Sequence, residues 1–443
     1  MVLILIALIR SGPRSHSAGF LSGTTPWIYL LNQPAMLVQY LKLAFWPHHL
    51  VLDYGLPRAV AVADVWPYAA VILALLAVTV VAWRTRPEVA FLGTWFFVTL
   101  APSSSIIPIA TEVGAERRMY LPLIAIVILC VVGAWWLLTQ FSSSFDSRRT
   151  RAIGAACLAA AYVALAGFTV QRNSEYRSRT GIWQTVLDRR PNGRAHYNLA
   201  IELKEEGNRP EAMRHYQLAL TDEPAAHYAV GFELDADGKH EEAIQHYREF
   251  IRLRPDDIDV IRAYVLLGRA LAIESQLEPA TEAFREALRR QPSNVDAQAG
   301  LAEVLLKQER YGEAVLAYRE YVRQKPDNPH AHAGLGIALV GRELDNEAVP
   351  EFVKAVELEP NDAGNHYNLG NALANTGRLD EAVNEYRRGL RLAPAHVALH
   401  NALGLVLAAR GQSDEALAEF RQSLALDPEN GQTRKDFATA FPR

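Results

Sequence analysis

A glutamate and two arginines stand directly in front of an apolar run, at Glu116, Arg117 and Arg118. Charged side chains are expensive at membrane depth, and those that occur there usually serve a purpose. Arginine can hold an anionic group through two parallel charge-assisted hydrogen bonds. It can equally anchor the end of a helix at the level of the lipid headgroups. The residues alone leave both roles open.

Asparagine is the second residue type that could bind a ligand, because its amide both donates and accepts hydrogen bonds and so can bind any peptide backbone. Five asparagines fall on predicted first helices of the repeats described below: Asn198, Asn368, Asn371, Asn375 and Asn401. Two of them, Asn198 and Asn368, share one phase of the repeat. They resemble the asparagine ladder of the O-GlcNAc transferase repeats, although Gly300, Gly334 and Ala402 hold that phase elsewhere. These asparagines could bind a peptide in a groove or could form ordinary solvated surface, and the sequence leaves both interpretations open.

Other chemistries leave no motif in the sequence. It contains no Walker A loop, no dinucleotide-binding glycine pattern, no H-E-x-x-H and no C-x-x-C. Cys130 and Cys157 both lie in apolar runs, which is typical of small hydrophobic residues rather than of a metal or disulfide pair. We interpret the histidines of the C-terminal half, such as His215, His227 and His246, as surface residues at unrelated phases. We predict no metal site, and the net charge of −4 gives no reason to expect nucleic acid.

The C-terminal half repeats itself. Four kinds of marker recur in phase seven times: a small residue, an alanine twelve positions later, an aromatic residue four positions after that, and a closing proline eight positions further on. The closing prolines are Pro224, Pro255, Pro292, Pro326, Pro360, Pro394 and Pro428. From Pro292 onward the step between closing prolines is constant. The two earlier steps, one shorter and one longer, together make two full periods.

This pattern resembles the tetratricopeptide repeat (TPR), in which each unit of roughly 34 residues is a pair of antiparallel helices. The small residue lies where the two helices approach most closely, and the proline cannot continue the second helix. We therefore predict seven repeats over residues 192–428 that form an α-solenoid. A connecting half-repeat helix over 171–191 should precede them, and a polar capping helix over 429–443 should close the solenoid.

The N-terminal half is apolar and nearly free of carboxylates. Four uncharged runs approach the roughly 20 residues needed to cross a bilayer, at about 67–83, 89–110, 119–141 and 152–170. The run at 27–46 contains Lys42 and several amides, so it could span the membrane or lie at its surface. Together they predict an all-α fold, with a multi-span transmembrane helix bundle over residues 1–170 followed by the solenoid.

Arginines in the short loops predict the orientation of these spans. Arg84 and Arg86 separate the first two runs, and Arg148, Arg149 and Arg151 precede the last one. Both loops should face the cytoplasm. The repeats then lie on the extracytoplasmic side, and we expect an integral protein of a bacterial inner membrane with periplasmic repeats.

The segment Ala101–Leu123, followed by these repeats, resembles the transmembrane-and-TPR family of endoplasmic-reticulum O-mannosyltransferases and its bacterial relatives. The residues that match the family pattern P-x-S…E-R-x-x-Y-x-P are Pro102, Ser104, Glu116, Arg117, Tyr120, Leu121 and Pro122. Two further stretches are similar to bacterial members, Leu50–Pro57 and Asn173–Pro191.

The resemblance implies a glycosyltransferase of the C-type class that takes a sugar from a polyprenyl-phosphate donor. In such a site Glu116, Arg117, Arg118 and Tyr120 would bind the donor phosphate, and a carboxylate would act as base on the acceptor hydroxyl or bind a metal. The family places its acidic residues in a loop after the first membrane helix. No acidic residue precedes Asp53 here. Asp53 and Asp64 are weak candidates to take that role on the outer face, and nothing in their spacing marks them as a pair.

This departure leads to the expectation that the chain lacks the N-terminal part of a transferase, and that it is not active alone. Two functions remain. The first is a membrane-anchored TPR scaffold that binds protein or peptide partners in its groove and contacts membrane lipid. The alternative is part of a polyprenyl-phosphate-sugar-dependent protein O-glycosyltransferase, with the repeats recruiting the acceptor.

Overall fold

A computed structural model describes residues 26–45, 60–100, 120–141 and 178–441, with isolated positions between 152 and 174. Every regular element in these ranges is an α-helix, which confirms the all-α class. The chain divides into two compact units, Met1–Ala226 and His227–Arg443. The division falls just after Pro224, which closes the first predicted repeat.

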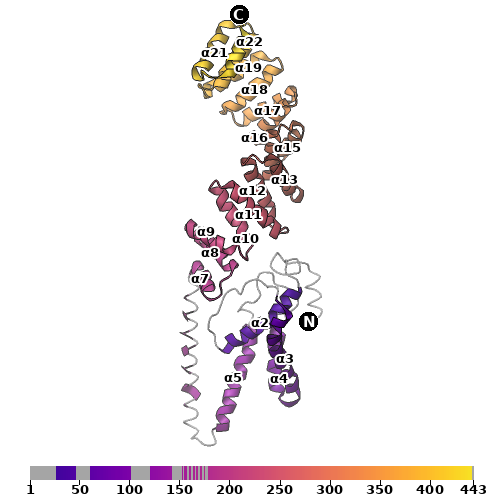
Figure 1. Ribbon diagram of the computed structural model, residues 1–443, viewed down its shortest axis with the longest axis vertical. Coiled ribbons are helices and arrows are strands. Elements are labelled where there is room, and N and C mark those ends of the chain that lie inside the picture. The colour runs from indigo at the N-terminus through magenta and orange to yellow at the C-terminus, as the bar shows by residue number, and fades with distance from the viewer. Residues whose placement is uncertain are drawn as a thin grey trace. The chain divides into compact units, whose positions relative to one another are not determined.

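The first unit begins with four apolar helices, shown in indigo to purple in Figure 1. These are α2 (Pro26–Phe45), α3 (Val62–Thr85), α4 (Pro87–Leu100) and α5 (Tyr120–Phe141). Helices α3 and α4 fold back on each other with Arg86 alone between them. They approach closely at Gly93, because a Cβ there would lie only 2.4 Å from the Thr79 hydroxyl. The sequence thus builds a tight helical hairpin.

One helix among the described residues is both long and apolar enough to cross a bilayer, namely α3. Only 11% of its most apolar window is buried within the protein. Helix α5 has 22 residues and carries no charged side chain, but the side chains near its two ends are not described. The predicted run at 89–110 is described only up to Leu100, within α4. Most of the predicted run at 152–170 lies outside the described residues. A multi-span bundle therefore stays a prediction.

The rest of the first unit comprises α7 (Arg179–Arg189), α8 (Gly193–Glu205) and α9 (Arg209–Ala219). Ser178 caps α7 by accepting a hydrogen bond from the Gly181 amide at 2.9 Å. Val186 and Leu187 of α7 are buried, and α7 packs on α8. Helix α7 thus takes the place of the predicted half-repeat helix.

The second unit is a series of helix pairs that follow one another in Figure 1 from α10 to the C-terminus. The pairs are α10 (Ala225–Ala236) with α11 (His240–Leu253), α12 (Val260–Ile273) with α13 (Leu277–Arg290), α14 (Val295–Lys307) with α15 (Tyr311–Gln324), α16 (Pro329–Val340) with α17 (Asp345–Leu358), α18 (Ala363–Asn375) with α19 (Leu379–Leu392), and α20 (Val397–Ala409) with α21 (Ser413–Leu426). Helix α22 (Gly431–Ala440) ends the described chain.

A capping side chain stands two residues after each of the last five closing prolines. Asn328, for example, accepts a hydrogen bond from the Ala331 amide at 3.0 Å and so begins α16. The same role falls to Asn294, Asp362, His396 and Asn430. An N-cap of this kind stabilises a helix by about 1 kcal/mol. The proline and its cap therefore end one repeat and begin the next.

The core of each repeat is an aromatic ring packed on a small residue. A Cβ added to Gly336 would lie 2.6 Å from the Phe352 ring, and one added to Gly370 would lie 2.4 Å from the Tyr386 ring. Both rings are at most 2% exposed. A larger residue at either glycine would have to displace the ring. The marker pattern in the sequence is thus a packing requirement.

Helix α22 packs against α20 and α21 at the end of the second unit. Its Phe437 ring meets the buried Phe420 ring edge-on at 5.7 Å between centroids. Its Asp436 accepts a hydrogen bond from the Asn401 amide at 2.7 Å. It covers the last pair at the position predicted for the capping helix.

Candidate functional site

The predicted donor-phosphate residues fall on a part of the chain that is largely not described. Asp53, Glu116, Arg117 and Arg118 lie outside the described residues. Tyr120 is the first residue of α5, but its side chain is not described. The phosphate site therefore stays a prediction.

Asp64, the other weak catalytic candidate, lies in the first turn of α3. It is exposed and lines a hollow of about 500 Å³ between α2 and α3. The hollow is otherwise bounded mainly by apolar side chains, together with Asn32 and Tyr68. None of the described residues that line it is cationic.

Three of the five predicted groove asparagines are engaged within the protein. Asn371 accepts a hydrogen bond from the Tyr386 hydroxyl at 2.7 Å. Burial raises the pKa of Tyr386, so this hydroxyl keeps its proton and acts as a donor. The amides of Asn375 and Asn401 donate to Asp345 and to Asp436 of α22, each at 2.7 Å. These amides hold neighbouring helices together.

Asn198 of α8 and Asn368 of α18, which share one phase of the repeat, differ from the other three. Both side chains are half-buried, and neither makes a hydrogen bond within the described residues. An amide of this kind is available to a ligand, since nothing described in the protein occupies its donor or acceptor.

The first helix of each pair keeps one stripe exposed. In α12, Arg262 and Arg269 lie seven residues apart on one face, exposed and without an ion pair or hydrogen bond within the described chain. The residue at the phase of Arg269, directly after the small residue, is exposed or half-buried in each later pair. These residues are Glu303, Ile337, Asn371 and Leu405. Ile337 and Leu405 keep 39% and 36% of their surface exposed.

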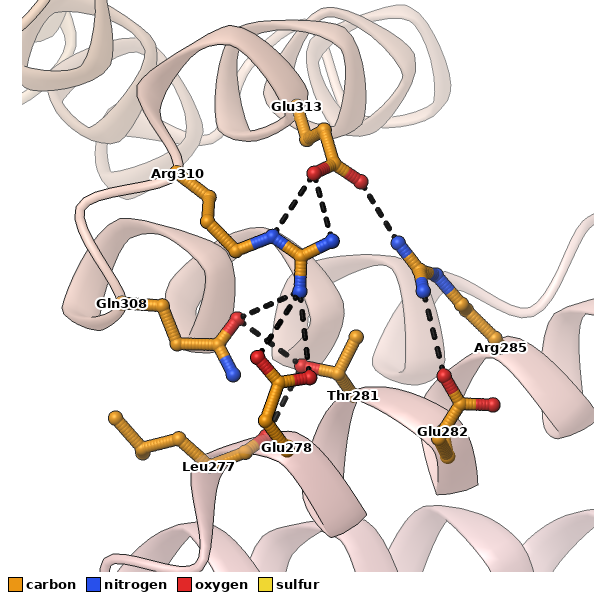
Figure 2. Close-up of polar contacts among 8 residues, drawn as sticks. All are labelled: Leu277, Glu278, Thr281, Glu282, Arg285, Gln308, Arg310 and Glu313. Carbon is orange, nitrogen blue, oxygen red and sulfur yellow. Dashed lines mark hydrogen bonds and ion pairs between the residues drawn. The ribbon is translucent and has the colours of Figure 1, made fainter.

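The second helices are joined by a polar network, shown for α13 to α15 in Figure 2. Arg310 donates to Glu313 through two nitrogens, at 2.8 and 2.6 Å, and reaches Glu278 of the preceding repeat at 3.3 Å. Arg285 donates to the other oxygen of Glu313 at 2.7 Å. The network links adjacent repeats at the surface and leaves these charges engaged.

One of these ion pairs recurs at the same phase of successive repeats but is interrupted once. The bond from Arg285 to Glu313 is repeated from Arg319 to Glu347 at 2.9 Å and from Arg387 to Glu415 at 2.7 Å. Between these last two pairs, the arginine position is taken by Val353, which is 39% exposed. A hollow of about 420 Å³ lies there, lined also by Pro350 and other residues of α17.

The prediction that the histidines are surface residues at unrelated phases is wrong. His332, His366 and His400 follow one another at the repeat period and are only 7%, 4% and 9% exposed. Each lies four positions before the small residue of its repeat. His196 and His227 hold the same position in the first two repeats. The spacing was visible in the sequence, but the partner that explains it comes from the second helix of the pair.

Each of the three C-terminal histidines has two fixed acceptors. Nδ1 of His366 lies 2.7 Å from Glu385, and Nε2 lies 3.1 Å from the carbonyl of the closing proline Pro360. The same two contacts occur at His332 and at His400. The histidine therefore ties the first helix to the second helix and to the preceding loop.

Helix pairs repeated at a fixed period, each closed by a proline and packed through an aromatic ring on a small residue, define a helical-repeat solenoid. The repeats are tetratricopeptide repeats. Models of the tetratricopeptide repeat match residues 224–257, 265–329, 334–396 and 367–431. The fixed period in the sequence thus identified the repeat correctly.

Curated relatives also match part of the chain. Protein O-mannosyl-transferase TMTC1 of Homo sapiens is 28% identical over 226 residues, and that of Mus musculus is 30% identical over 226 residues. The match covers 47% and 48% of this chain but only 25% and 22% of those proteins. The chain thus spans about a quarter of the length of these relatives.

Solved TPR structures resemble the repeats. One is YrrB, described as a TPR protein with an unusual peptide-binding site, at 25% identity and a TM-score of 0.38. It aligns over 43% of this chain and 96% of its own. Another is MamA from Desulfovibrio magneticus RS-1, at 23% identity and a TM-score of 0.38, over 40% of this chain and 97% of its own.

Proposed function

We propose that this chain is a membrane-anchored TPR scaffold that binds an extended segment of a partner protein along the exposed stripes of its first helices. The observation that carries this proposal is the open stripe itself. At the phase of Arg269 and Ile337, the first helices α12, α14, α16 and α20 each present an exposed side chain that the repeat packing does not need. At the same phase of α18, Asn371 is engaged by Tyr386. The second helices, in contrast, engage most of their charges with one another.

The chemistry of the stripe indicates the kind of segment that fits. Arg262 and Arg269 are unpaired cations and suit a carboxylate of the partner. Ile337 and Leu405 offer apolar surface further along the series. Asn368 can bind the intervening backbone without regard to sequence. An extended peptide with an acidic residue followed by apolar residues is therefore the expected ligand.

Two substitutions test this function, one that reverses a charge and one that replaces an apolar side chain with a charged one. The full chain in lipid nanodiscs is probed with an array of defined peptides, and the variants Arg269→Glu and Ile337→Glu should each lose the peptides that the native chain enriches. Leu316→Glu is the matched control, because Leu316 is 66% exposed on the second helix α15. Enrichment that survives both stripe variants, or that Leu316→Glu abolishes equally, would refute the stripe as the binding surface.

Several features of the first unit support a membrane anchor. Trp66 and Trp83 are 64% and 56% exposed near the two ends of α3. They lie about 26 Å apart along the helix, close to the hydrocarbon thickness of a bilayer. Exposed tryptophans at such a spacing are typical of the two interfacial belts. We infer further spans around α3, which would complete the multi-span bundle.

The arginines at the turn between α3 and α4 support a cytoplasmic hairpin and hence extracytoplasmic, periplasmic repeats in a bacterial inner membrane. Side-specific labelling tests this topology. A single cysteine at the exposed position Leu316 should react with an impermeant maleimide added outside intact spheroplasts, in a variant whose native cysteines are replaced. Labelling only after lysis would place the repeats in the cytoplasm.

The similarity to protein O-mannosyl-transferase favours a second candidate. The chain would form part of an O-glycosyltransferase that uses a polyprenyl-phosphate sugar, with Glu116, Arg117, Arg118 and Tyr120 at the donor phosphate and the repeats recruiting the acceptor. Arg117→Ala and Arg118→Ala should then abolish sugar transfer in membranes that contain the full protein. Unchanged transfer in both variants would remove this site, while the peptide array above would still report on the scaffold.

A further inference from the structure

The position that holds a histidine and a glutamate in the last three repeats holds two histidines in the first two. In the first repeat, Nδ1 of His196 lies 2.9 Å from Nδ1 of His215. In the second repeat, Nδ1 of His227 lies 3.0 Å from Nδ1 of His246. At this distance one ring must donate and the other must accept. The two facing nitrogens therefore share a single proton. If both rings become protonated, two positively charged imidazoles lie in contact.

Burial is the main reason why the pKa of each of these four histidines lies below its ordinary value. In the first pair, His215 and Arg214 lower the pKa of His196 further, while Asp222 partly raises it. Arg214 also lowers the pKa of His215, and Glu211, 3.5 Å from its Nε2, partly raises it.

In the second pair, Glu249 partly raises the pKa of His227 and Arg252 lowers it. His227 lowers the pKa of His246, and Glu242 partly raises it. The nearby carboxylates are thus outweighed by burial in both pairs. The folded repeat holds these rings neutral more firmly than the unfolded chain does.

The His–Glu pairs of the last three repeats have the opposite arrangement. An imidazolium has two N–H donors, and each ring faces two acceptors, a carboxylate at 2.6 to 2.7 Å and a proline carbonyl at 2.9 to 3.1 Å. The two acceptors around each ring thus match the two donors of a cationic imidazole, and no second histidine lies in contact with the ring within the described residues.

We propose that this solenoid is graded in its response to acid, so that mild acidification loosens the first two repeats while the last three stay closed. The element that switches is the histidine pair between the two helices of each of the first two repeats. The His–Glu pairs at the same position in repeats five to seven are the built-in contrast.

The direction follows from proton linkage. Because the folded state holds the paired histidines neutral, the unfolded state binds more protons once the pH falls below the ordinary histidine pKa of about 6.5. The neutral histidine pairs therefore stabilise α8 to α11 fully above that pH. This contribution to the free energy of unfolding is lost as the pH falls through the lowered pKa of the paired histidines. Each unit by which a pKa is lowered corresponds to about a ten-fold change in the opening equilibrium.

Hydrogen exchange of the full chain in detergent, at about pH 7.5 and about pH 5.5 and corrected for the intrinsic rate, tests the proposal. Opening of α8 to α11 should increase by about ten-fold or more at the lower pH, while α16 to α21 change little. Equal changes in both groups of helices, or no change in either, would overturn it.

Exchanging the pair types separates the histidines from other causes. His246→Glu converts the second repeat to the His–Glu type and should remove its acid response. Glu385→His converts the sixth repeat to the His–His type and should create one. His330→Gln is the matched control, because His330 is exposed on α16 and belongs to no pair within the described residues. A second repeat that still opens in acid after His246→Glu would refute the mechanism.

Discussion

The apolar helices of the first unit and the repeat helices of the second unit contain similar residues but bury them very differently. In α3 only Val65 and Ala82 are buried, while Val78, Val80 and Val81 are each about 60% exposed or more. In α12 eight residues are buried, and the exposed face carries arginines. Within the described residues these valines have no apolar cover, although a helix that is apolar all round is normally buried.

This difference shows that hydrophobic content alone does not make a packed core. The repeat helices have a partner for each apolar stripe, because a glycine or alanine on one helix admits an aromatic ring from the next. Helix α3 meets α4 where Thr79 approaches Gly93 and also packs on α2, but most of its side chains are exposed within the described residues. The following predictions test each side of this comparison, from the largest expected effect to the smallest.

Removing a buried ring should have the largest effect. Phe352→Ala should lower the free energy of unfolding of the second unit by about 3–5 kcal/mol, because a cavity remains beside Gly336. Urea denaturation followed by circular dichroism measures this loss. Val353→Ala is the control, since its side chain is 39% exposed, and it should change stability little. Equal losses in the two variants would contradict the assignment of Phe352 to the core.

A charge introduced on the exposed face of α3 should have a slightly smaller effect. It should disturb membrane insertion of the helix instead of folding. Leu73 lies in the middle of α3 and is 55% exposed, so Leu73→Arg adds about 2.5–3.5 kcal/mol to the cost of placing this helix in a bilayer. The fraction of protein that resists alkaline extraction from membranes should fall sharply. The conservative Leu73→Ile keeps the surface apolar and should extract like the native chain. A Leu73→Arg variant that stays fully membrane-bound would show that α3 does not face lipid.

Removing the hydrogen-bond acceptor of a buried tyrosine comes next. Asn371→Ala leaves the Tyr386 hydroxyl without its acceptor and should cost about 1–3 kcal/mol of stability. Asn368→Ala provides the contrast, because its side chain has no hydrogen bond to lose within the described residues. Thermal unfolding of the two variants should therefore differ, although both remove one amide from the same helix. If Asn368→Ala were the more destabilising, the roles given to these two amides would be reversed.

The smallest effect is expected at the repeated ion pair. Arg319→Ala should change the stability by less than about 1 kcal/mol, because the partners Arg319 and Glu347 are both more than half exposed. Adding salt should reduce even that difference. A loss that is large and independent of salt would mean that the repeated pairs hold the repeats together, rather than the buried rings.

The second unit was largely predictable because its markers are local. Pro360 ends one helix, Asp362 begins the next, and Gly370 and Tyr386 must meet if the two helices pack. Each of these requirements acts within one repeat and recurs at the same spacing, so the period alone reveals it. The position of α22 after the last proline follows in the same way.

The candidate site was only partly predictable. The phase of Asn368 identified an open side chain, but the same reasoning grouped it with Asn371, Asn375 and Asn401, which are engaged within the protein. The partner of Asn401 is Asp436, which lies on a helix outside the repeat pattern. No spacing rule predicts that contact. The buried histidines were missed for the same reason, since the Glu385 partner of His366 lies on another helix.

The sequence by itself determined the helices, their pairing and the identity of the repeat, because these depend on backbone restriction by proline, on capping and on the need of an aromatic ring for a small neighbour. The tertiary structure decided which polar side chains are free and which are engaged. That choice depends on distances between helices, and a side chain such as Asn371 or His366 becomes structural only when a partner from the second helix reaches it.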